Sequence, residues 1–90
     1  MNKKIDSRLI GQTIRLLRVR EHLTQEALAD AIGYSERNLR RIEAVGTSSI
    51  DVVNTFAEYF QVSALDILNG CLLFLFNKKA LMTFAIQYLL

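Results

Sequence analysis

The feature that most constrains this chain is the stretch 23–43, LTQEALADAIGYSERNLRRIE, which predicts two short helices joined by a tight turn. Thr24 and Ser35 carry side-chain oxygens that accept free backbone N–H groups at a helix start, so each is expected to cap a helix. Gly33 stands between them, where a helix commonly ends in a left-handed residue. The expected inner face of the first helix consists of Ala27, Leu28, Ala31 and Ile32.

The second helix of this stretch, expected over residues 35–44, has polar and basic residues on its outer side. Leu39 and Ile42 lie three positions apart and predict an inward stripe. Side chains of the outward type bond base edges or phosphates, and a helix fits the major groove of DNA. A solvated basic face is the alternative interpretation. The outward residues are Glu36, Arg37, Asn38, Arg40 and Arg41.

The rest of the chain predicts an all-α domain of five helices over residues 8–70, preceded by a flexible arm, residues 1–7, and followed by an apolar extension, residues 71–90. Three further helices are expected over residues 8–21, 50–60 and 64–69, with Ser49 and Ser63 as caps and Gly70 as the last stop. Their inward residues are expected to be Ile10, Ile14 and Leu17, then Ile50, Val53, Phe56, Ala57 and Phe60, then Leu65 and Leu68.

This arrangement resembles the phage repressor/Cro-like (Xre-type) helix-turn-helix DNA-binding family over residues 8–70. The resemblance is carried by Ile14, Leu17, Arg18, Leu23, Thr24, Gln25, Leu28, Ala29, Ile32, Gly33, Ser35, Leu39, Arg41, Ile42, Glu43, Leu65, Ile67 and Leu68. It implies that Glu36, Arg37, Asn38 and Arg41 contact bases. It also implies a DNA-backbone contact from Gln25. We expect further backbone contacts from Ser35, Arg40, Thr47 and Ser48.

Each of these side chains suits its implied role. An arginine can bond guanine O6 and N7 with two N–H groups, glutamate can accept from cytosine N4, and asparagine can pair with adenine. The resemblance also implies that Gln25 braces the first residue of the next helix, although a simple polar residue in a first turn would look the same. It further implies a structural ion pair between Arg18 and Glu43, for which two separate solvated charges are the alternative.

The loop 44–49 departs from the family, which often places a cation there. Its sequence, AVGTSS, has none, so phosphate contacts must come from backbone N–H groups and from the hydroxyls of Thr47, Ser48 and Ser49. Residues 1–46 nevertheless hold nine Lys or Arg against six Asp or Glu, a balance of +3, whereas residues 47–70 have a balance of −3. The basic half therefore coincides with the expected DNA-binding helices.

Catalysis and cofactor binding are not expected. The single histidine, His22, and the single cysteine, Cys71, cannot form a zinc site, and no nucleophile–base set is present. We therefore expect no enzyme activity, no metal, no cofactor and no small-molecule substrate. Cysteine usage and the absence of a signal peptide at the start favour a reducing, cytoplasmic setting.

The segment 71–90 is too apolar for a small monomer to cover, which favours a partner. A homodimer interface is the leading interpretation, and Cys71 is then a small buried hydrophobe rather than a redox sensor. Folding back over its own domain is a second interpretation. Membrane association is disfavoured because Lys78 and Lys79 separate two short apolar runs. The expected dimerisation residues are Leu72, Phe74, Phe76, Leu81, Phe84 and Tyr88.

Together these features predict a sequence-specific regulator of transcription that binds double-stranded DNA, as a dimeric repressor of a near-palindromic operator. Two alternatives use the apolar extension to bind a different protein. One is an antitoxin, and the other is a protein-interaction adaptor that has lost DNA binding, which the cation-free loop would suit.

Overall fold

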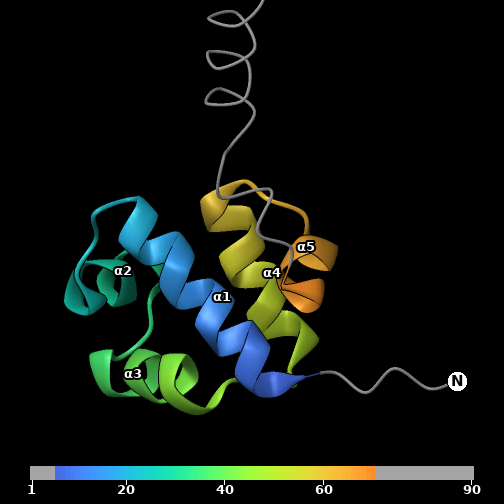
Figure 1. Ribbon diagram of the computed structural model, residues 1–90. Coiled ribbons are helices and arrows are strands. Elements are labelled where there is room, and N and C mark those ends of the chain that lie inside the picture. Colours follow the sequence, from blue (N-terminus) through green and yellow to red (C-terminus); the bar gives the residue numbers. More distant parts are fainter. Residues whose placement is uncertain (1–5, 71–90) are drawn as a thin grey trace, which may run out of the picture.

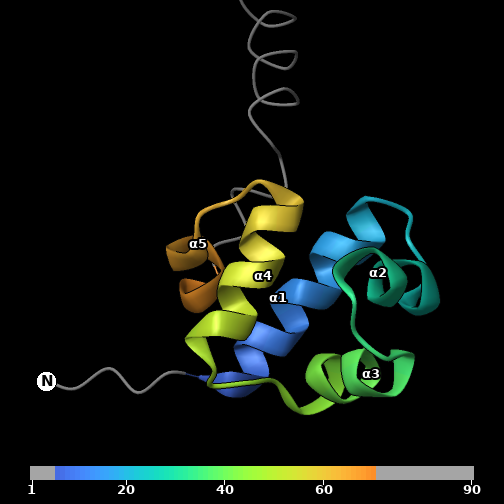
Figure 2. The ribbon, with the colours of Figure 1, turned by 180° about the vertical axis from the view of Figure 1, so that it is seen from behind.

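The computed structural model describes residues 6–70, and within this range every regular element is a helix. The elements are α1 (Ser7–Arg20), α2 (Gln25–Ile32), α3 (Glu36–Val45), α4 (Ile50–Phe60) and α5 (Ala64–Asn69). The helix α1 lies in the middle, with α2 and α3 on one side and α4 and α5 on the other (Figures 1 and 2). None of these helices is long and apolar enough to cross a bilayer. The predicted all-α fold of five helices is confirmed.

Each helix begins at a residue whose side chain accepts a free backbone N–H. Thr24 and Ser35 accept from the N–H groups of Ala27 and Asn38, both at 3.0 Å, as predicted. Ser49 and Ser63 do the same for α4 and α5. The cap of α1 is Asp6, so this helix begins one residue earlier than expected. These short helices would be marginal alone, and the caps define where each one starts.

The core is formed where α1 meets α3, α4 and α5, and α2 packs against α3 and α4. Phe56 of α4 is fully buried, and the ring of Tyr34 packs edge-on against it at 5.8 Å between centroids. Ile10, Ile14 and Leu17 supply the face of α1, as expected. The other buried apolar residues are Leu28, Ala29, Leu39, Ile42, Val53, Ala57, Phe60 and Ile67.

The prediction of which side of α2 faces the core was wrong for two residues. Leu28 and Ala29 are buried, whereas Ala27 and Ala31 are exposed. The helix packs against both α3 and α4. Its buried side is therefore formed by Leu28, Ala29 and the half-buried Ile32.

Two residues of α4 and α5 that were expected to face the core are exposed instead. Leu65 is 66% exposed, and the fully buried residue of α5 is Ile67. This helix packs against both α1 and α4, and the position that points between them is 67. Ile50 is 47% exposed because it is the first residue of α4, beyond the edge of the core.

Two glycines allow α1 and the end of α3 to touch. A Cβ at Gly11 would collide with the carbonyl oxygen of Ile42 and lie 3.0 Å from the Cα of Gly46. Gly46 has φ +85°, and a Cβ there would overlap the carbonyl of Ser7 and lie 2.9 Å from the backbone nitrogen of Arg8. The backbone after α3 is therefore pressed directly onto the first turn of α1.

Candidate nucleic-acid interface

The outer face of α3 is a row of exposed charged side chains. Its apolar residues Leu39 and Ile42 are buried, which fixes the rotation of the helix. Asn38 is half-buried at the edge of this face, and Ser35, the cap, is exposed. The structure thus turns outward most of the α3 residues for which the sequence predicts DNA contact. The exposed members are Glu36, Arg37, Arg40 and Arg41.

Two bonds within α3 organise this face. Arg40 Nη2 lies 2.9 Å from Glu36 Oε1, one helical turn away. Arg41 Nη2 donates to Asn38 Oδ1 at 2.9 Å. Arg37 has no bonding partner within residues 6–70. Its whole guanidinium is available for a fork-like contact with a guanine or a phosphate.

A buried ion pair holds α3 to α1. Arg18 Nε lies 2.6 Å from Glu43 Oε2, and Arg18 Nη2 donates to Glu43 Oε1 at 3.0 Å. The two side chains are only 14% and 3% exposed, so this is a two-point contact away from water. Arg18 Nη1 also donates to the carbonyl of Leu23 at 2.8 Å, which adds the turn before α2 to the same cluster.

Gln25 completes the cluster. Its Nε2 donates to Glu43 Oε1 at 3.1 Å, whereas the family resemblance implied a brace at the opposite end of α3. The carboxylate of Glu43 therefore joins α1, α2 and α3. Sequence reasoning missed the Gln25–Glu43 bond, because no local pattern links two residues 18 positions apart.

The loop after α3 uses one of its expected phosphate donors inside the protein. Thr47 is half-buried and Ser48 is exposed. The backbone N–H of Ser49 donates to Thr47 Oγ1 at 3.1 Å, and Ser49 Oγ accepts from the N–H of Val52 at 3.3 Å. The backbone donor of Ser49, expected for phosphate contact, is therefore already used inside the protein.

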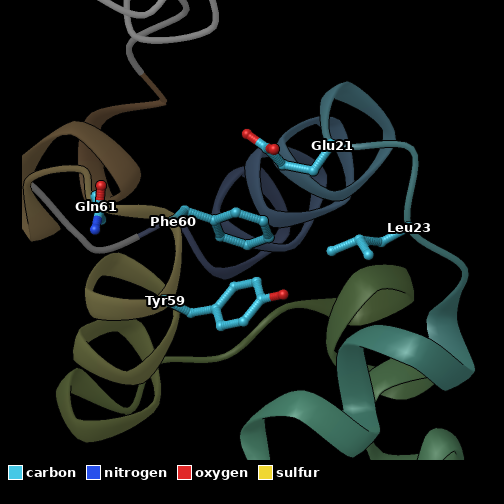
Figure 3. Close-up of a pocket in the computed structure, with 5 residues that line it drawn as sticks. All are labelled: Glu21, Leu23, Tyr59, Phe60 and Gln61. Atoms are coloured by element: carbon cyan, nitrogen blue, oxygen red, sulfur yellow. The ribbon is translucent and has the colours of Figure 1, made fainter.

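A hollow of about 380 Å³ lies where the C-terminal ends of α1 and α4 meet (Figure 3). Tyr59 and Phe60 line it with their rings, and Leu23 closes one side. Its one carboxylate, on Glu21, lies 2.8 Å from Arg20 Nη2. The lining therefore brings together no set of groups suited to acid–base or nucleophilic chemistry.

Several predicted contact residues fall outside the described range. Lys3 and Lys4 of the expected arm lie there, and so does Cys71. The expected dimerisation residues also lie outside it, namely Leu72, Phe74, Phe76, Leu81, Phe84 and Tyr88.

Comparison with known proteins agrees with this geometry. A family model described as a helix-turn-helix domain matches residues 9–67, about two-thirds of the chain. No curated protein matches the sequence. The matched segment contains α2, α3 and the turn between them, together with the helices that hold them. The chain therefore belongs to the helix-turn-helix domain family, in the Xre/Cro-like group.

Proposed function

We propose that this protein is a regulator of transcription that binds double-stranded DNA sequence-specifically through α3. The observation that carries the proposal is the arrangement of that helix. Its outer face exposes Arg37 and Arg41, while Glu43 at its other side is tied to α1 and α2. A rigidly held helix with outward arginines suits the major groove, where bidentate contacts discriminate base pairs.

In this proposal, some of the interface residues contact bases and the others contact backbone phosphates. Arg37 and Arg41 take guanine edges, and Glu36 penalises sequences without a matching donor. Ser35 and Arg40 lie beside them on α3, and Gln25 stands at the start of α2, a position where free N–H groups favour phosphate. Thr47 and Ser48 add uncharged contacts after α3. Asn38 completes the base-facing set.

The protein is proposed to act as a homodimeric repressor in the cytoplasm. One domain of this size covers few base pairs, and two related by a two-fold axis would bind half-sites about one helical turn apart. The sequence of residues 71–90 supplies the apolar surface for this pairing.

A protein-interaction role is the second candidate, and the absence of a cation in the loop 44–49 favours its adaptor form, which has lost DNA binding. An antitoxin would bind DNA and also hold an unrelated small protein through the segment 71–90. An adaptor would bind a protein partner but no duplex.

Selection of bound duplexes from a random pool tests the main proposal. We expect one enriched, near-palindromic sequence. Arg37→Ala and Arg41→Ala should each weaken binding to that sequence by about 1–3 kcal/mol and relax the preference at one base position. Arg15→Ala, which removes an exposed arginine from α1, is the matched control. No enrichment by the parent protein would reject DNA binding. Unchanged selectivity of both α3 variants would reject the base contacts.

A further inference from the structure

The cation-free loop after α3 begins in contact with the first turn of α1. Gly46 lies so close to the first turn of α1 that a Cβ on it would reach to 2.9 Å from the backbone nitrogen of Arg8. Thr47 and Ser48 follow directly. The backbone at Gly46 and the first turn of α1 are therefore in direct contact, although 38 positions separate Arg8 from Gly46 along the chain.

Among residues 6–70, Arg8 is the cation that stands at this contact. Its side chain is exposed, and no hydrogen bond or ion pair joins it to another residue within 6–70. An arginine in this state has all its guanidinium N–H groups free, and the planar group matches two phosphate oxygens at once. The neighbouring acid is Asp6, whose Oδ1 accepts from the N–H of Leu9 at 3.2 Å.

We propose that Arg8 binds a DNA backbone phosphate next to the loop residues Thr47 and Ser48, and so supplies from α1 the positive charge that the loop lacks. This inference rests on the proposed DNA binding. A phosphate contact carries no base preference, so Arg8 raises affinity for every duplex equally and makes it more salt-dependent.

The test measures the affinity of the full chain for its selected duplex and for a random duplex over 50–200 mM salt. We expect Arg8→Ala to weaken binding to the two duplexes equally. The plot of log association constant against log salt should become less steep, by about 1 per bound subunit. The parent protein should therefore lose about threefold more affinity per subunit than the variant across this salt range.

Arg15→Ala is the matched control, because Arg15 is an exposed arginine on the same helix, about 10 Å farther along the axis. It should leave the slope at the parent value. Asp6→Asn keeps a capping oxygen and removes the neighbouring negative charge, so it should strengthen binding to both duplexes. Thermal unfolding midpoints confirm that each variant is folded.

The outcomes separate the inference from the function on which it rests. If the parent binds its selected duplex while Arg8→Ala leaves the slope unchanged, the phosphate contact is wrong and DNA binding stands. If Arg15→Ala reduces the slope as much as Arg8→Ala, the effect is one of total charge, and the specific contact is again wrong. A parent protein that binds no duplex overturns both.

Discussion

At the scale of single residues, Glu43 has the most demanding environment in the described part of the chain. Its carboxylate is 3% exposed and accepts from two nitrogens of Arg18 and from Gln25. A buried charge is tolerated only when it is paired and hydrogen-bonded, and removal of one partner leaves the other stranded.

Glu43→Ala should therefore lower the free energy of unfolding by about 3–5 kcal/mol, because Arg18 loses its counter-charge away from water. Urea denaturation followed by circular dichroism measures the change. Glu36→Ala is the control on the same helix. It removes a carboxylate that is 44% exposed and paired with an arginine at 62%, so the cost should be about 0.5 kcal/mol or less. Equal losses would show that the Arg18–Glu43 pair is not the stronger anchor.

Gln61 is a position where a substitution should increase the free energy of unfolding. It ends α4 with φ 56° and ψ 46°, a left-handed conformation that costs energy for a residue with a Cβ. Gln61→Gly should raise the free energy of unfolding by about 0.5–1 kcal/mol, as thermal or urea unfolding can measure. Gln61→Ala keeps the Cβ and should bring no gain. A gain as large from alanine as from glycine would mean that side-chain loss, not backbone strain, is responsible.

At the scale of the helices, most ends and the inward sides of α1 and α3 were predictable, whereas the inward sides of α2 and α5 were not. Thr24, Ser35, Ser49 and Ser63 cap helices as the sequence predicted, because capping depends on residues within one turn. The bounds of α4 and α5 agree with those predicted. The inward sides of α2 and α5 depend on two neighbouring helices each, and a single stretch of sequence does not contain that information.

The contact between α1 and α3 also gives a prediction at this scale. Gly11→Ala adds a methyl group against the backbone carbonyl of Ile42, which cannot rotate away as a side chain would. Alanine is the better helix former, yet we expect a net loss of about 1–3 kcal/mol of unfolding free energy from overpacking. Gln12→Ala, at an exposed site one residue further on, should change stability by at most about 0.5 kcal/mol. Stabilisation by Gly11→Ala would mean that the two helices separate at little cost.

At the scale of the whole molecule, the family resemblance implied one support of the candidate interface, the Arg18–Glu43 pair, but the other supports were not predicted. The outward row on α3 follows from helical spacing alone. The bond from Gln25 to Glu43 and the contact of Gly46 with Ser7 and Arg8 join residues far apart in the chain, and only the packing of α1 against α3 brings them together. That residues 71–90 form a dimer interface stays a prediction.

Removal of residues 71–90 tests that prediction. We expect sedimentation equilibrium to give the monomer mass for the truncated chain and twice its own monomer mass for the full chain. Affinity for the full operator should fall, because two linked domains bind half-sites far more tightly than separate ones. Leu65→Ser is the control, since it removes an exposed leucine from α5 and should leave the dimer intact. If the full chain sediments as a monomer, or the truncated chain as a dimer, the apolar extension is not the interface.

The separation of the two sides of α3 has a consequence for how such a protein can diversify. Leu39, Ile42 and Glu43 fasten the helix from within, and Glu36, Arg37, Arg40 and Arg41 add nothing to that core. The outer four positions can therefore be exchanged as a set without disturbing the buried contacts that hold the helix. Grafting the outer residues of a related helix-turn-helix protein onto this helix should transfer that protein's target preference and leave the melting temperature nearly unchanged.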